Sequence, residues 1–172
     1  MTKKWLENRD KERPFFVMCH HKAPHDFWEY HKRHEDLFQG VDIPVPDSLF
    51  EDRKHRSLAT RDFGSSVTPR SRIRSLYCDF CRDDYVTGKL EGTEGMNFEE
   101  KGIAAYQKYL KDYLRTVAAI DESVGQLINT LEEDAVWKIQ LSFIRLIREY
   151  FWENMIIRIS VGVLKKVCAP RF

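Results

Sequence analysis

Three histidines and a lysine, His20, His21, Lys22 and His25, lie within six residues near the start of this 172-residue chain. A neutral imidazole can accept a proton or bind a metal, and a protonated imidazole pairs with an anion, as lysine does. The cluster therefore suits the binding of a sulfate, phosphate or carboxylate group. Histidines that only hydrogen-bond to loop backbone are the alternative, and the cluster by itself leaves both interpretations open.

A short apolar run, residues 14–20, leads into this cluster and begins with Pro14. Such a run is typical of a strand buried on both faces of a parallel sheet. In open α/β sheets, ligands bind just beyond the carboxyl ends of the strands. The sequence therefore predicts an α/β fold in which the histidines lie where a ligand site is expected.

Metal binding is a second interpretation of the same region. The additional candidate ligands Cys19, His31 and His34 give no recognised zinc spacing, and Cys78 and Cys81 form a lone C-x-x-C without a second pair. We therefore expect no zinc site, and a small metal-binding protein that uses the histidines and cysteines remains an alternative.

Residues 98–132 show the clearest helical pattern in the chain. Asn97 and Glu100 are spaced as an N-cap and its acidic partner. Apolar residues recur at alternating intervals of three and four and predict one face that packs against a sheet. They are Ile103, Tyr106, Leu110, Tyr113, Val117, Ile120, Val124, Leu127 and Leu131. The polar residues assigned to the water side are Lys108, Lys111, Asp112, Arg115, Asp121 and Glu122.

The rest of the chain gives weaker signals. Residues 2–9 read as the end of a helix with Trp5 and Leu6 as apolar contacts, and one short helix is expected near 75–82. Between them lie loops and a basic stretch, which we interpret as solvated because acidic residues are interleaved with it. Its members are Arg53, Lys54, Arg56, Arg61, Arg70, Arg72 and Arg74.

Composition excludes several classes of protein. A hydrophobic content of 42% indicates a globular chain, and a net charge of +1 gives no bias toward nucleic acid or anionic membranes. No apolar run is long enough to span a membrane, and the N-terminus lacks the apolar core of a secretory signal.

Several segments together resemble the type I sulfatases of the alkaline-phosphatase-like fold. The segment Arg13–His25 is similar to the family's strand and loop with the pattern P-F-F…H-K-x-P-H. The similarity continues through residues 36–38 and 41–52, and it resumes over residues 106–127. The resemblance implies a partial α/β sandwich, here with one clear strand, the long helix and extended loops.

The resemblance also implies chemistry. Members of the family hydrolyse sulfate esters of carbohydrates and other alcohols with a formylglycine nucleophile and a calcium ion. His25 matches the family histidine that contacts sulfate or protonates the leaving alcohol, so it is the candidate catalytic residue. Lys22 and His21 are further candidates for sulfate binding. Members are commonly secreted, periplasmic or lysosomal, and in an exported protein Cys78 and Cys81 would be able to form a disulfide.

The chain departs from the family in two places. The nucleophile motif, Cys or Ser followed by x-Pro-x-Arg, occurs nowhere in it, and the acidic calcium ligands have no matching position. We expect these elements upstream of Met1, which makes residues 1–133 an inactive fragment of a sulfatase catalytic domain. A non-catalytic module that binds anions or sulfated glycans is the alternative.

The last part of the chain, residues 134–172, matches nothing in the family as written. Back-translated with allowed codons and read from the third base, Leu146–Met155 encodes Asp-Gln-Gly-Ile-Phe-Leu-Gly-Glu-His. This resembles the family's metal-ligand strand end and the loop after it. In the same frame, Lys165–Phe172 permits Glu-Ser-Leu-Arg-Ala-Pro-Phe, also a family sequence. The two matches predict a frameshift near residues 132–134 and an out-of-frame tail.

Overall fold

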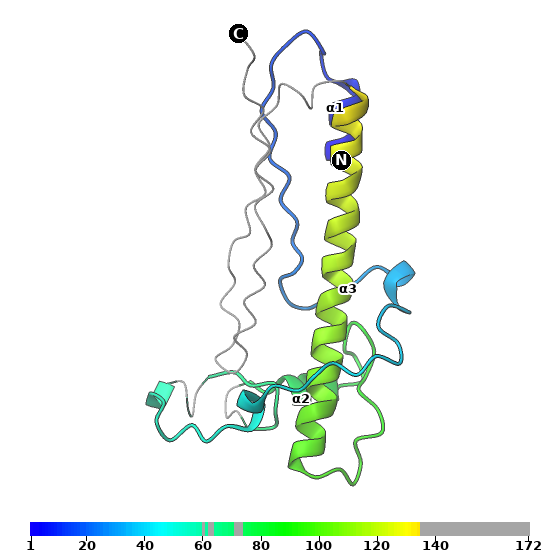
Figure 1. Ribbon diagram of the computed structural model, residues 1–172. Helices are drawn as coiled ribbons and strands as arrows, with labels where there is room; N and C mark the ends of the chain where they lie inside the picture. The colour runs from blue at the N-terminus through cyan, green and yellow to red at the C-terminus, as the bar shows by residue number, and fades with distance from the viewer. Residues whose placement is uncertain (60, 62–63, 71–73, 135–172) are drawn as a thin grey trace.

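A single long helix organises the structure, a computed structural model that describes residues 1–59, 61, 64–70 and 74–134 (Figure 1). The helices that lie wholly within the described residues are three α-helices and two short 3-10 helices, and these residues form no strand. The α-helices are α1 (Thr2–Asn8), α2 (Leu76–Phe80) and α3 (Phe98–Glu133). The 3-10 helices are η1 (Lys32–His34) and η2 (Asp47–Phe50).

The start of α3 is fixed by its own sequence. The Asn97 side chain accepts a hydrogen bond from the Glu100 backbone N–H at 3.0 Å, and the Glu100 carboxylate accepts one from the Asn97 N–H at 2.7 Å. This reciprocal pair is a capping box, which satisfies two helix-end donors that would otherwise lack partners. The helix predicted over residues 98–132 and its N-cap are both confirmed.

The apolar face of α3 packs against aromatic side chains from loops and from α2. Tyr109 is 1% exposed, and its ring meets Trp28 edge-on at 4.6 Å between centroids. Phe80, at the end of α2, is fully buried in the same cluster. Within the described residues this core replaces the sheet that the sequence predicted as the packing partner. Ile103, assigned to the same stripe, is exposed.

The strand predicted over residues 14–20 is wrong for the described part of the chain. The segment is extended but unpaired, and Phe16 and Met18 are 83% and 65% exposed. Among the described residues, β-type pairing occurs at one parallel bridge, between Ser66 and Ser75. A strand forms only when neighbouring strands take up its backbone hydrogen bonds, and the described residues offer this segment none.

The two ends of the described chain meet beside each other. Helix α1 lies along the C-terminal end of α3, at the top of Figure 1. The Asp134 carboxylate accepts hydrogen bonds from Arg9 at 3.1 Å and from Lys11 at 2.6 Å. The hydrogen bond from Lys11 lowers the pKa of the Asp134 carboxyl. Helix α1 is confirmed, as is the short helix near 75–82, which is α2. In α1, Leu6 is buried whereas Trp5 is 45% exposed.

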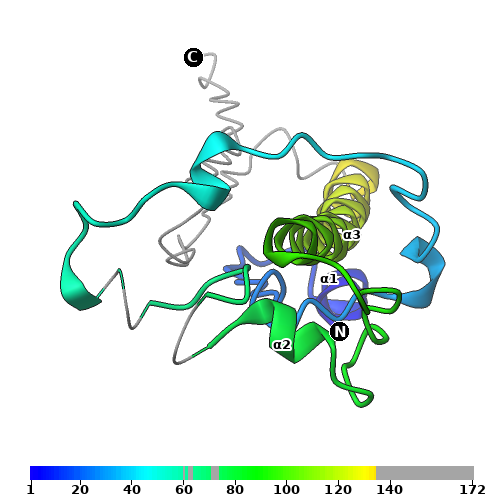
Figure 2. The same ribbon diagram turned by 90° about the horizontal axis from the view of Figure 1, so that it is seen from below.

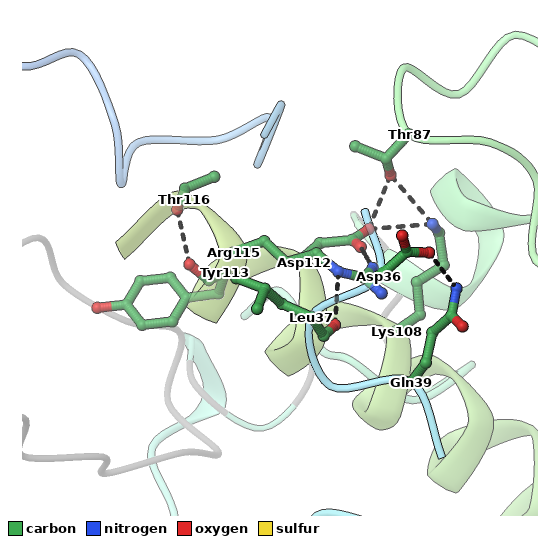
Figure 3. A network of polar contacts seen from close by, with 9 residues as sticks. All are labelled: Asp36, Leu37, Gln39, Thr87, Lys108, Asp112, Tyr113, Arg115 and Thr116. Atoms are coloured by element: carbon green, nitrogen blue, oxygen red, sulfur yellow. Dashed lines mark hydrogen bonds and ion pairs between the residues drawn. The ribbon is translucent and has the colours of Figure 1, made fainter. Parts of the chain in front are cut away.

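A buried polar cluster lies on the side of α3 that the sequence assigned to water (Figure 3). Asp112 is 1% exposed, and the side chains of Lys108 and Arg115 are 13% and 12% exposed. The Asp112 carboxylate accepts hydrogen bonds from Thr87 Oγ1 at 2.7 Å, Lys108 Nζ at 3.0 Å and Arg115 Nη1 at 2.9 Å. Arg115 also donates to the carbonyl of Leu37 at 3.0 Å. The expected water face is therefore a junction where two loops attach to α3.

Removing the carboxylate of Asp112 should unfold this junction. We expect Asp112→Ala to lower the free energy of unfolding by about 3–5 kcal/mol, because two buried cations lose their counter-charge. Asp36→Asn is the control, since the Asp36 carboxylate is exposed and accepts a hydrogen bond from the exposed Gln39 side chain. Chemical denaturation measures both, and equal stabilities would contradict the assigned role of Asp112.

The two glycines of α3 differ in their surroundings. A Cβ at Gly102 would lie 2.8 Å from the Phe50 ring and 3.1 Å from Thr68, whereas a Cβ at Gly125 would meet nothing within 4 Å. Gly102 therefore lets η2 and the Thr68 segment approach the helix closely.

Alanine at these two positions should have different effects. Gly125→Ala should stabilise the chain by about 0.5–1 kcal/mol, the usual gain for alanine over glycine within a helix. Gly102→Ala should lose part or all of that gain, because Phe50 must move. Thermal melting of the two variants decides this, and an equal rise in Tm would show that the Phe50 contact is not restrictive.

Candidate functional site

The candidate residues lie on an exposed turn that follows the extended segment. The backbone N–H of His25 donates to the carbonyl of Lys22 at 3.1 Å, so these two residues close the turn together. Both side chains are exposed, as is that of His21. His21 differs from the other two because its ring nitrogen Nε2 lies 3.9 Å from the Cys19 sulfur. The structure thus places Lys22 and His25 on one turn and His21 just before it.

One ring nitrogen of His25 is directed at Asp26. Nδ1 lies 2.9 Å from the Asp26 carboxylate oxygen Oδ1 and 2.8 Å from the Asp26 backbone carbonyl. The carboxylate itself is only 21% exposed, whereas the His25 side chain is 57% exposed. His25 therefore has a partly buried acceptor on one side, and more than half of its side-chain surface is exposed.

Asp26 is in turn held by a residue distant in sequence. Arg74 Nη2 donates to Asp26 Oδ2 at 2.8 Å, and Arg74 Nε donates to Asp79 Oδ2 at 3.0 Å. Partial burial alone would lower the pKa of Arg74, but its hydrogen bonds to Asp26 and Asp79 raise it. The guanidinium also lies over the Phe27 ring, 5.8 Å from its centroid. Arg74 therefore remains charged and joins the histidine loop to α2.

Sequence reasoning missed this arrangement. Asp26 directly follows His25, which is a local signal for a histidine–carboxylate pair. Arg74 was assigned to a solvated loop, and its partner Asp26 lies 48 residues away, so no spacing rule connects them.

The basic stretch is not a solvated loop throughout. Arg53 is 4% exposed and donates to Ser66 Oγ at 3.4 Å, and Arg70 donates to the carbonyl of Glu51 at 3.1 Å. Arg56 pairs with the Glu51 carboxylate. Lys54 and Arg61 are exposed as predicted, and Arg72 lies outside the described residues. The interpretation is therefore wrong for the arginines that pack against η2 and the segment after it.

Part of this stretch surrounds a cavity of about 420 Å³. Its lining is Phe50, Glu51, Asp52, Arg53, Lys54, Arg61 and Arg70. Contacts within the lining weaken the positive electrostatic potential in the cavity. Lys54 pairs with Asp52 at 3.1 Å, and Arg70 donates to the Glu51 carbonyl. The cavity is therefore lined by both signs of charge, and its basic side chains are partly neutralised within the lining.

The described residues do not fit a metal ion. Among them, no three His, Cys, Asp or Glu side chains come together as a metal site. Cys19, Cys78 and Cys81 are free thiols, so the structure shows no disulfide between Cys78 and Cys81. The calcium ion that the sulfatase resemblance implies would need ligands from elsewhere, and we derive no step through it. In the same part of the chain, no helix is apolar enough over sufficient length to cross a bilayer.

Comparisons with known proteins agree with the resemblance in the sequence. The chain is 31% identical to an N-acetylglucosamine-6-O-sulfatase of Bacteroides thetaiotaomicron, in a match that covers 75% of this chain and 28% of that enzyme. It also matches the solved structure of BT4656 in complex with its substrate D-glucosamine-2-N,6-O-disulfate. That match has a TM-score of 0.58 and 26% identity, and covers 80% of this chain and 33% of the other.

The structural match supports the predicted partial sulfatase fold, although the described residues form helices without strands. The chain spans less than a third of the curated relative's length. The model of the Sulfatase family matches residues 1–140, which include the histidine turn and all of α3. On this match the chain belongs to the sulfatase family.

Proposed function

We propose that this chain carries the part of a sulfatase that contacts the sulfate group of a sulfated glucosamine. The observation that carries the proposal is the exposed turn with Lys22 and His25, which lies inside the region matched by the family. The names of the two relatives support glucosamine sulfate as the substrate class. From the usual localisation of family members, we also propose that the protein is secreted, periplasmic or lysosomal.

The residue chemistry of the turn suits a sulfate ester. A sulfate group carries negative charge on oxygens that accept hydrogen bonds, and the Lys22 ammonium offers three donors. Protonated His25 adds a further donor and a proton for the leaving alcohol. His21 is a secondary contact, because its Nε2 is already near the Cys19 sulfur. We therefore assign His25 the catalytic role and Lys22 and His21 supporting roles in binding.

A binding role without hydrolysis is the second candidate. It is favoured by the absence from the sequence of the Cys/Ser-x-Pro-x-Arg motif that supplies the family's nucleophile. Both candidates require the histidine turn to bind sulfate, and they differ in whether the turn belongs to a protein that hydrolyses the ester.

Loss of the His25 ring should weaken sulfate binding. We expect His25→Gln to raise the Kd for D-glucosamine 6-sulfate about tenfold, equivalent to about 1.4 kcal/mol, a modest loss because the site is exposed. Calorimetric titration measures it. His55→Gln, an exposed histidine of the basic stretch, is the matched control and should bind as the wild type does. Equal affinities for all three proteins would refute the sulfate contact by His25.

The 172-residue chain by itself should release no inorganic sulfate. The reason is chemical, because no residue of the sequence lies in the nucleophile motif. Ion chromatography after incubation with D-glucosamine 6-sulfate tests this, with a full-length active sulfatase as the positive control. Sulfate release above the buffer blank would overturn the assignment of an inactive fragment.

The boundary at residues 133 and 134 also stays a proposal, since the tail falls outside the described residues. Genomic sequence across the locus tests it. An indel near codon 133 that restores Asp-Gln-Gly, with a nucleophile motif upstream, would establish a broken sulfatase reading frame. A clean locus with neither feature would refute the frameshift.

A further inference from the structure

A series of ion pairs links His25 to three charged residues, Asp26, Arg74 and Asp79. Asp26 joins His25 to Arg74, and Arg74 joins Asp26 to Asp79, so the charges alternate in sign along the chain. We propose that Asp26, held by Arg74, is a positioning residue that fixes the His25 ring with its Nδ1–H on Asp26 and presents Nε2 to the sulfate ester. The inference rests on the proposed role of His25 in sulfate contact.

The acceptors around Nδ1 determine where the ring proton lies. Two oxygens of Asp26 lie within hydrogen-bond distance of Nδ1, the carboxylate Oδ1 and the backbone carbonyl, and neither has a hydrogen to donate. Nδ1 must therefore carry the proton. In the neutral ring Nε2 then has the lone pair, and in the charged ring Nε2 is the second donor. This assignment gives His25 one defined tautomer, as expected for a histidine that must orient toward a ligand.

The position of Asp26 is itself determined by contacts on its far side. Its second carboxylate oxygen accepts a hydrogen bond from Arg74 Nη2 at 2.8 Å, and the Arg74 side chain is 26% exposed. Arg74 directly precedes Ser75 of the one β-type bridge in the described residues, and the Ser66 N–H donates to the Arg74 carbonyl at 3.0 Å. This hydrogen bond fixes the backbone of Arg74, and the side chain extends from that point to Asp26. A carboxylate held at one oxygen can orient a ring at the other.

The charge of Asp26 has a second consequence for His25. A carboxylate at 2.9 Å favours the charged imidazolium, and Arg74 partly offsets this from the other side of Asp26. The charged groups linked to the ring by these contacts are Asp26 on its own loop, Arg74 from the segment before α2, and Asp79 within α2. A protonated Nε2 would donate to a sulfate oxygen as a charge-assisted hydrogen bond.

Nuclear magnetic resonance of the full chain, labelled with ¹⁵N in histidine, tests the proposal without any need for turnover. The Nδ1 and Nε2 shifts of His25 at a pH where the ring is neutral report the tautomer. We expect the Nδ1–H form to dominate in the wild type. A dominant Nε2–H form would overturn the proposal.

Two variants separate orientation from charge. Asp26→Ala should raise the share of the Nε2–H form, because Nδ1 loses the carboxylate acceptor and keeps only the weaker backbone carbonyl of residue 26. Asp26→Asn keeps the shape, and its His25 titration midpoint should fall by about 0.5 pH unit, a modest shift at an exposed site. Asp83→Asn is the matched control, because it removes the same charge from an exposed pair with Lys89. A midpoint that moves equally in Asp26→Asn and Asp83→Asn would overturn the role of Asp26.

Adding sodium sulfate or D-glucosamine 6-sulfate to the same samples separates this inference from the proposed function. If the His25 tautomer is Nδ1–H and the ligand leaves the His25 signals unmoved, the positioning pair stands and the sulfate contact fails. If the ligand shifts the signals of a ring in the Nε2–H form, the sulfate contact stands and the positioning pair is overturned. Circular dichroism of each variant confirms that the helices are retained.

Discussion

The buried carboxylate of Asp112 is the constraint on which the rest of the described structure depends. A charge that is 1% exposed is tolerated only when it is paired and hydrogen-bonded, and Asp112 satisfies this with three donors from two segments. Lys108 extends the effect to the aromatic core, because its ammonium lies 5.2 Å from the centroid of the Tyr85 ring and 5.7 Å from that of Phe80. One carboxylate therefore connects the helix, a loop and the core.

The same core sets the position of the candidate site. Phe80 packs in the core between α2 and α3, and Figure 2 shows α2 beside the first half of α3. The residues that enter α2 form the bridge between Ser66 and Ser75, and Arg74 lies beside that bridge. From there Arg74 reaches Asp26 and, through it, His25. The orientation of an exposed histidine thus follows from packing around the first half of α3.

The sequence predicted features whose interacting residues are close together in the chain, and it failed where the partners are far apart in sequence. The start of α3 was predictable because Asn97 and Glu100 contact each other within one turn. The burial of Asp112 was not, because helical periodicity counts charged residues as water-facing and cannot see Thr87, 25 residues away in sequence. For the same reason, the sequence pattern predicted a role for His25 but gave no sign of its link to Arg74. The family resemblance needed only residue patterns, and the family match confirms it.

The failed strand shows a different limit. The run at residues 14–20 has the composition of a strand buried in a sheet, but composition indicates what a segment requires and cannot supply its neighbours. Phe16 is exposed because its hydrogen-bonding and packing partners are not among the described residues. The histidine turn that follows is attached in another way, through Asp26 to Arg74 and the bridge at Ser66. The orientation of His25 therefore does not require that strand to be paired, so the proposed sulfate contact is compatible with a segment that has no strand partner among the described residues.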